Sequence, residues 1–390
     1  MNWRRRLSQV RTVMGIMHGG RAFTGPFQAR LSLSNRCNIR CIHCYFFSPF
    51  LEKPTSISLL RDLQVSLKPS DNGYGPSPKF DADTEKTRSL LKELLDAGTC
   101  QVLFSGRGEP FLHRNVLDLM GYAKRGGALC LINTNGTLLD PATINELLKM
   151  GFDELRITVM GGSREVYMRT HPGIGPETFD SLKENLLYLA GQKAARRVRK
   201  PKVTLVFIVV AQNHEGLFEF AEFAAGVSAD RILYRPVDDL EDKGLSKLVL
   251  AREQSLHVRK QLVEVESYLE DKGISHNIKN FLRVFQQQID TTELYRIIPC
   301  YYGWLSTMIE VDGTIYACCR CSQPLGNIYK EGFNKIWYGP SYERFRKSAL
   351  HINARKSPVT GCDCNSCVNH EANSRAYQML HPVKSRLTKR

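Results

Sequence analysis

The chain has 390 residues, of which 42% are hydrophobic and 24% are charged, so it is long enough for more than one domain and has the composition of a globular protein. Its longest strongly apolar run, residues 203–211, is shorter than half of a membrane span. No continuous apolar segment follows the N-terminal charges, which excludes a secretory signal peptide. We therefore expect a cytoplasmic protein without a transmembrane segment.

The net charge of +15 is spread over the chain rather than held in one block. It favours an anionic partner, such as a phosphorylated or carboxylated substrate or an anionic membrane surface, and no specific nucleic acid is expected. No acidic residue precedes Glu52, and the cations before it are all arginines, a bias that transit peptides share. Residues 1–27 are interpreted as a basic N-terminal extension.

Twelve cysteines without a secretory signal argue against a disulfide framework and for metal ligands. Three of them form a C-x3-C-x2-C motif at Cys37, Cys41 and Cys44. Seven more lie near the C-terminus, at Cys300, Cys318, Cys319, Cys321, Cys362, Cys364 and Cys367. The two that stand alone, Cys100 and Cys130, lie at or in apolar segments, where we expect plain buried thiols.

Apolar segments with the pattern of buried strands alternate with helical patterns between residues 28 and 240. The predicted strands are residues 29–34, 101–106, 128–134, 154–160, 203–210 and 231–237. One predicted helix spans residues 84–96, and another begins at Asp140-Pro141 with a cap and a first-turn proline. Six such units in a row predict an α/β fold with a parallel sheet, curled or open, and helices outside it.

Three unusual turns follow the first three predicted strands. They are the cysteine motif, the sequence SGRGEP at 105–110 and the sequence TNG at 134–136. Ligands bind at the C-terminal ends of strands in such folds, so the three turns are expected to face one cavity. TNG alone is also compatible with a simple strand-ending turn.

The pattern changes after the sixth strand. Residues 241–295 are predicted as a charged helical connection. From about residue 296 to 370 we expect a small α+β domain, in which Asp312-Gly313 joins two short strands as a hairpin. A domain of so few residues has only a small core, so we expect a bound metal to stabilise it. Residues 371–390 are interpreted as a basic tail.

Three clustered cysteines are one ligand short of a structural zinc site. His43 is poorly placed to supply the fourth ligand, because it adjoins Cys44 on a tight loop. A [4Fe–4S] cluster takes one cysteine for each iron, so three cysteines leave one iron open for a cofactor or substrate. The alternative to an iron–sulfur enzyme is a protein of another class, which binds zinc at these cysteines and also binds nucleic acid.

The cysteine motif, followed one strand later by SGRGEP, resembles the radical S-adenosylmethionine (SAM) enzymes. The resemblance implies a partial (β/α)6 TIM-type barrel in which Cys37, Cys41 and Cys44 bind a [4Fe–4S] cluster. It implies that SAM chelates the open iron and is reductively cleaved to a 5′-deoxyadenosyl radical, which abstracts a substrate hydrogen. It also implies that Gly108 and Glu109 help to hold the SAM amino group.

Residues 157–173 resemble the fourth-strand segment of the same family, although Met160 stands where the family often has aspartate. The resemblance implies that Thr158 approaches the SAM ribose and Arg169 its carboxylate. Asn213, after the fifth strand, is a further ribose candidate. An ordinary strand threonine and a loop-capping asparagine are the alternatives for Thr158 and Asn213.

The spacing C-x12-G-x4-C from Cys300 to Cys318, with the later pair Cys364 and Cys367, resembles the SPASM or shorter twitch domains of this family. It implies one auxiliary [4Fe–4S] cluster held by these four cysteines, with zinc as the alternative. Cys319, Cys321 and Cys362 are surplus. They are interpreted as alternative ligands, part of an incomplete second cluster, hydrogen-donating thiols or packed thiols.

A fully ligated auxiliary cluster is suited to accept an electron. The resemblance therefore favours a radical SAM oxidoreductase that carries out a net oxidation of a carbohydrate-like or other small substrate, with flavodoxin or ferredoxin as external electron donor. The positive net charge favours an anionic substrate. The alternatives are a peptide maturase that forms crosslinks or thioethers, and an epimerase with Cys319 or Cys321 as catalytic hydrogen donor. We see no added leader-binding segment before the first strand, which favours the small substrate.

Overall fold

The computed structural model describes residues 3–51, 81–237, 245–287, 291–355, 359–364, 367 and 369–381. Six strands lie close to the six predicted segments. Their bounds are β1 Gln28–Leu31, β2 Gln101–Phe104, β3 Leu129–Thr134, β4 Glu154–Thr158, β5 Lys202–Val209 and β6 Arg231–Pro236. All neighbours pair in parallel, in the order β6-β5-β4-β3-β2-β1.

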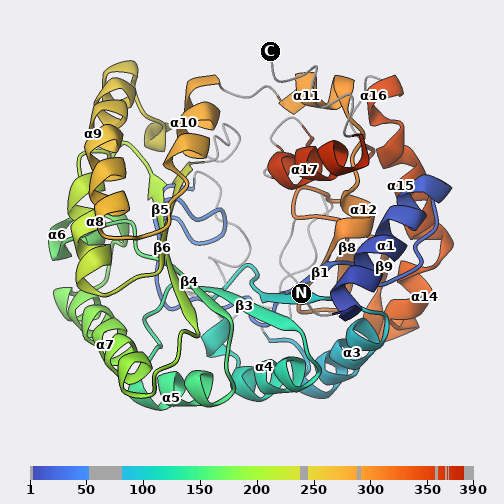
Figure 1. Ribbon diagram of the computed structural model, residues 1–390, viewed down its shortest axis with the longest axis horizontal. Coiled ribbons are helices and arrows are strands. Elements are labelled where there is room, and N and C mark those ends of the chain that lie inside the picture. Colours follow the sequence, from blue (N-terminus) through green and yellow to red (C-terminus); the bar gives the residue numbers. More distant parts are fainter. Residues whose placement is uncertain are drawn as a thin grey trace.

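Helices cover the outer face of this curved sheet (Figure 1). On β1, for example, Ala29 and Leu31 are buried in the core beneath the helices, so Arg30 lies on the opposite, concave side. The sheet does not close, because β6 ends it on one side. This arrangement confirms the predicted partial barrel.

The helices begin where the sequence supplies a cap. Asp83 accepts a hydrogen bond from the Lys86 backbone amide at the start of α3, and Asp140 does the same for Thr143 at α5. The helices between the strands are α3 Thr84–Asp96, α4 Val116–Arg125, α5 Pro141–Lys149, α6 Arg164–Thr170, α7 Pro176–Ala195 and α8 Leu217–Gly226.

The C-terminal part adds three strands to the same sheet. The predicted hairpin is present: β7 Ser306–Ile309 and β8 Thr314–Tyr316 are antiparallel, followed by β9 Gly326–Asn327. However, β7 also pairs in parallel with β1, so the sheet has nine strands without a break. The open edge of β1 explains this extension, because its backbone groups need partners.

The remaining helices follow β6 or precede β1. They are α9 Arg252–Asp271, α10 Ile278–Gln287, α11 Thr291–Ile297, α12 Tyr302–Leu305, α13 Ile328–Glu331, α14 Phe333–Trp337, α15 Pro340–Leu350, α16 Ile352–Arg355, α17 His370–Leu380 and, at the N-terminus, α1 Trp3–His18. The segment predicted as an extension is thus largely a helix. Among the described residues, no helix is both long and apolar enough to cross a bilayer. The predicted boundary at residue 240 lies outside the described residues.

Candidate functional site

The first cysteine motif lies on a loop that leaves the C-terminal end of β1. The loop is folded on itself, since the Cys44 amide donates to the Cys41 carbonyl at 3.1 Å and the Ser48 hydroxyl donates to the Ile42 carbonyl. It is anchored to α6, because the Ile42 amide donates to the Thr170 carbonyl at 3.0 Å. These hydrogen bonds therefore fix the part of the loop that carries Cys41 and Cys44.

Burial and mutual repulsion shift the titration of these thiols. Burial, with a smaller contribution from the neighbouring Cys44, raises the pKa of Cys37 to about 12. Burial also raises the pKa of Cys41 well above its usual range, with Cys44 and Cys37 adding to the effect. Such thiols ionise when a cation binds them. Three soft donors of this kind fit three irons of a [4Fe–4S] cluster.

Gly108 lets the SGRGEP turn lie directly against the cysteine loop. A Cβ atom on Gly108 would lie 2.1 Å from the Arg36 carbonyl oxygen, one residue before Cys37. The Gly108 amide donates to the Ser34 carbonyl at 3.1 Å, and the Glu109 amide donates to the Arg36 carbonyl at 2.8 Å. The two predicted turns are thus joined by backbone contacts.

Glu109 joins this turn to the TNG turn after β3. Its carboxylate accepts from the Thr134 hydroxyl and the Asn135 amide, both at 2.8 Å, and from the Phe111 amide at 3.2 Å. Burial raises the pKa of Glu109 to about 7, although these hydrogen bonds lower it. The structure therefore gives Glu109 a local positioning role. Its contact with SAM stays a prediction.

The TNG turn also reaches the cysteine loop, which the sequence left open. The Asn135 side-chain amide donates to the Cys37 sulfur at 3.8 Å and to the Asn38 side chain at 2.9 Å. Asn38 in turn donates to Thr137 at 2.7 Å. The position of TNG at a strand end was the available signal, and the structure makes all three turns one hydrogen-bonded unit.

The three further SAM-binding candidates differ in their surroundings. Thr158 ends β4 and is half-buried on the concave side. Arg169 is exposed on α6, 3.9 Å from Glu165. Asn213 is buried, and its side chain donates to the Met160 and Ile208 carbonyls and accepts from the Val210 amide. The structure thus supports the loop-capping role for Asn213, and all three SAM contacts stay predictions.

A second group of cysteines surrounds a pocket in the C-terminal part. The six cysteines that line it are Cys300, Cys318, Cys321, Cys362, Cys364 and Cys367. Burial, with smaller contributions from Cys367 and Cys364, raises the pKa of Cys300 to about 12. The Tyr295 hydroxyl lies 3.0 Å from the Cys367 sulfur. The four cysteines predicted as auxiliary ligands therefore share one buried pocket whose donors fit a [4Fe–4S] cluster.

Two of the surplus cysteines pair with each other. Cys321 and Cys362 lie on facing backbone segments and form a disulfide. In this state Cys321 has no S–H group, which removes the basis for its predicted role as hydrogen donor. Cys319 keeps a free thiol and accepts a long hydrogen bond from Asn369 at 4.0 Å.

The two cysteine groups are connected by side chains. Arg320 lines the second pocket, and its guanidinium lies 5.9 Å from the centre of the Tyr45 ring, which adjoins Cys44. Arg107 of SGRGEP forms a buried ion pair of 3.2 Å with Glu310, just after β7, and packs over Phe46 at 5.3 Å. Both contacts join residues that are far apart in the sequence.

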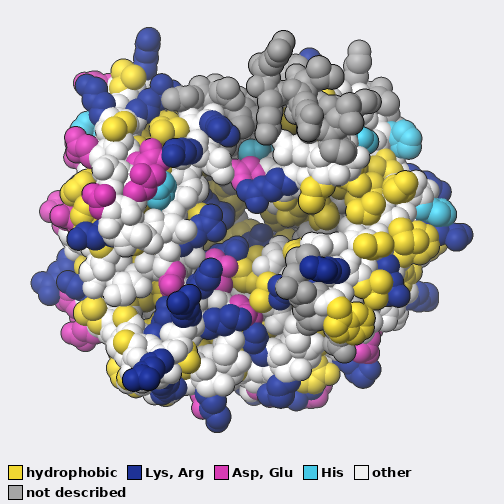
Figure 2. Space-filling model, in the orientation of Figure 1, with side chains coloured by type: hydrophobic (Ala, Val, Ile, Leu, Met, Phe, Trp, Pro, Cys, Tyr) yellow, Lys and Arg dark blue, Asp and Glu magenta, His cyan; other side chains and the backbone are white. Residues whose placement is uncertain are grey.

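The concave side of the barrel carries polar side chains between these groups. Arg30 donates to the Ser105 carbonyl and hydroxyl at 3.3 and 3.1 Å, and Asn133 donates to the same hydroxyl at 2.9 Å. Figure 2 shows that the molecule is hollowed near its centre, with Lys and Arg side chains around the hollow. This interior offers donors to hydroxyl or anionic groups.

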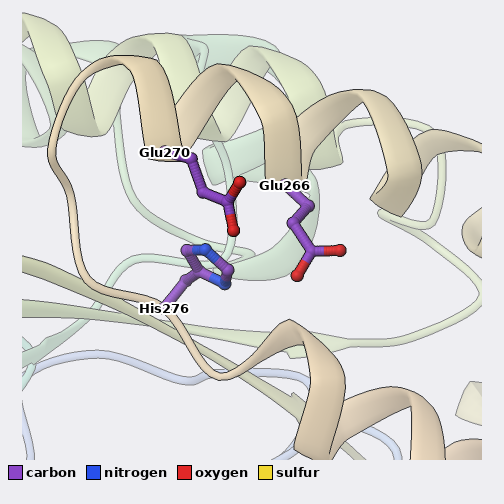
Figure 3. Close-up of side chains that lie close together, drawn as sticks. All are labelled: Glu266, Glu270 and His276. Atoms are coloured by element: carbon purple, nitrogen blue, oxygen red, sulfur yellow. The ribbon is translucent and has the colours of Figure 1, made fainter.

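One group of other potential metal ligands occurs among the described residues. Glu266, Glu270 and His276 lie close together on α9 and the loop that follows it (Figure 3). Lys279 lies 3.6 Å from Glu266 and 3.9 Å from Glu270, so these carboxylates already have a cation. The group belongs to the outer helices and takes no part in the site.

The sequence profile of the radical SAM superfamily matches residues 31–224, and that of the iron–sulfur cluster-binding domain SPASM matches residues 300–368. The chain belongs to the radical SAM superfamily and carries a C-terminal SPASM domain. Its cofactors are accordingly a [4Fe–4S] cluster that works with SAM, together with auxiliary iron–sulfur.

Among similar proteins, Fe-coproporphyrin III synthase of Methanosarcina barkeri is 27% identical over 130 residues, which cover 33% of this chain and 26% of that protein. The subtilosin biosynthesis protein AlbA of Bacillus subtilis is 21% identical over 92% of this chain and 71% of its own length. The crystal structure of Streptococcus suis SuiB bound to its precursor peptide SuiA has a TM-score of 0.60 at 15% identity, over 94% of this chain and 78% of SuiB.

Proposed function

We propose that this radical SAM enzyme carries out a net oxidation of a substrate held between the two cysteine groups. Cys37, Cys41 and Cys44 hold the SAM-binding cluster in this proposal, and the four ligands of the second pocket hold one auxiliary cluster. When bound, these groups supply a hydrogen-abstracting 5′-deoxyadenosyl radical and a one-electron acceptor. The substrate thus loses a hydrogen atom, then an electron and a proton, which makes a two-electron oxidation.

The contact between Arg320 and Tyr45 carries the proposal. It brings the loop of Cys318 and Cys321 against the residue that follows Cys44. A substrate in the barrel interior therefore lies beside both cysteine groups. The buried pair of Arg107 and Glu310 supports this, because it fixes the SGRGEP turn to the turn between β7 and β8.

The residues on the concave side support a polar substrate. Arg30 and Asn133 place charged and neutral donors there, as hydroxyl or carboxylate groups require. A carbohydrate-like or other small anionic compound is our first candidate. Peptide crosslinking or thioether formation is the second, and the similarity to AlbA and to SuiB with its precursor peptide favours it.

Anaerobic reconstitution with iron and sulfide tests the proposed chemistry. We expect about eight irons per chain. We also expect SAM cleavage when dithionite is the reductant in place of a physiological donor such as flavodoxin or ferredoxin. Cys364→Ser should reduce the iron to about four and keep SAM cleavage, but abolish oxidised product. A variant that still oxidises substrate would contradict the role of the auxiliary site. Zinc-loaded protein that leaves SAM intact would contradict the whole proposal.

Deuterium transfer identifies the class of substrate. The enzyme is incubated with SAM and an extract of cells grown in deuterated water, and 5′-deoxyadenosine is analysed by mass spectrometry. For comparison, a second portion of the same extract is digested with protease and filtered before it is incubated with the enzyme. Deuterium transfer that survives digestion supports the small substrate, and transfer lost on digestion supports the peptide.

A further inference from the structure

Helix α1 turns its small and polar side chains toward the protein. Ser8 and Thr12 are buried, and a Cβ atom on Gly15 would lie 2.8 Å from the Arg21 carbonyl and 3.0 Å from Trp304. The Trp304 indole donates to the same carbonyl at 2.8 Å. This close approach to α12 fixes which face of α1 is inside.

The opposite face of α1 is apolar and exposed. We call it the outer stripe of α1, and it consists of Trp3, Leu7, Val10, Val13, Met14 and Met17. Residues spaced by three and four positions share one helix face. The usual surface helix turns such residues to the core, so α1 has the reverse orientation.

Positive charge accompanies the outer stripe. Arg6 and Arg11 are exposed on α1, and no acidic residue precedes Glu52. The acidic group that interacts with His18 and Arg21 nearby is Glu343, which pairs with Lys347 at 2.7 Å. Figure 2 shows hydrophobic and Lys or Arg side chains side by side over α1.

We propose that α1 binds the surface of an anionic lipid membrane, with the outer stripe among the lipids and Arg6 and Arg11 at the phosphates. Apolar residues beside arginines on one helix are typical of helices that lie in the membrane interface. Arginine side chains reach back to the headgroups while the residues beside them enter the apolar layer.

The charges argue against a second copy of the chain as the occupant. Two α1 helices packed by their outer stripes would bring Arg6 and Arg11 of both copies together, and α1 contains no acidic residue to pair with them. An anionic bilayer supplies both an apolar layer and negative charge. The proposal is independent of the reaction that the enzyme catalyses.

Sedimentation of the reconstituted full chain with vesicles tests the proposal. We expect binding to vesicles of phosphatidylcholine mixed with phosphatidylglycerol, little binding to phosphatidylcholine alone, and release at high salt. Val10→Glu with Met14→Glu should weaken binding more than tenfold. Arg6→Gln and Arg11→Gln should each weaken it about fivefold.

The matched control is Leu256→Glu with Val263→Glu on α9. These residues are 51% and 68% exposed, against 51% for Met14 and 56% for Val10, so both pairs add the same charges at comparably exposed positions. The control should bind vesicles as the wild type does. Both double variants should keep full iron content and SAM cleavage, because neither helix belongs to the proposed site.

Trp3 provides an independent signal. It is 67% exposed, whereas Trp304 and Trp337, the other two tryptophans, are 2% and 0% exposed. Anionic vesicles should therefore shift tryptophan emission to the blue, and Trp3→Phe should remove the shift. Failure of the wild type to bind anionic vesicles would overturn the proposal. The proposal would also be overturned if the double variant Val10→Glu with Met14→Glu bound these vesicles as tightly as the wild type. A wild-type dimer that this double variant dissociates would overturn it as well, since a second copy would then cover the stripe.

Discussion

Replacing Gly108 with alanine should separate the SGRGEP turn from the cysteine loop. The added Cβ would lie 2.1 Å from the Arg36 carbonyl oxygen, whereas ordinary contact begins at 3.4 Å, so the backbone must move by about 1.3 Å. That movement strains two backbone hydrogen bonds, from Gly108 to Ser34 and from Glu109 to Arg36. Overpacking at about 1–3 kcal/mol and the two bonds at about 1 kcal/mol each predict a loss of about 3–5 kcal/mol in the free energy of unfolding.

Thermal unfolding of the apoprotein and iron analysis of the reconstituted protein measure this effect. Gly108→Ala should lower the melting temperature and reduce the iron from about eight to about four per chain, because Cys37 directly follows Arg36. Gly191→Ala is the control, since nothing lies within 4 Å of the added atom in α7 and alanine favours a helix by about 1 kcal/mol. A Gly108→Ala protein with wild-type melting and full iron would refute the reasoning.

Three other predictions concern the surroundings of the first cysteine group and the ligands of the second. The pKa of Glu109 is raised to about 7, so the folded apoprotein binds an extra proton between about pH 4.5 and 7 and should lose stability as pH rises through that range. Denaturant unfolding should show this loss in the wild type and a smaller one in Glu109→Gln; parallel curves would contradict it. Asn135→Ala removes the hydrogen bond to the Cys37 sulfur and should make the potential of the first cluster more negative, as measured by a redox titration followed by electron paramagnetic resonance; an unchanged potential would exclude that role. Cys362→Ala should keep about eight irons per chain, since the four proposed ligands of the second pocket are unchanged, whereas a fall to about four would make Cys362 a ligand.

The strands and helices of the barrel could be predicted because local patterns determine them. The helical spacing of the leucines predicted a helix at residues 84–96, and α3 has these bounds. The placement of three turns at one end of the sheet followed from parallel strand order alone. The structure confirms it by the contacts of Arg36, Gly108, Glu109 and Asn135.

Features that depend on partners distant in the sequence could not be predicted. The pairing of β7 with β1 depends on which edge is free in the folded barrel. Asn213 has the same sequence setting whether it caps a loop or contacts a ligand, and only its three hydrogen bonds distinguish the two. The apolar residues of α1 face outward because Gly15 and Trp304 fit together, which no periodicity reveals.

The unbroken pairing of β1 with β7 fixes the distance between the two cysteine-bearing parts of the chain. Strands in a sheet are spaced by about 4.8 Å, the first cysteine loop leaves β1, and the hairpin from β7 leads directly to Cys318. Relative sliding of the two metal-binding parts would break this hydrogen-bonded ladder. The separation of the two cysteine groups is therefore set by the backbone, and in the proposed reaction it would also set the distance over which an electron passes.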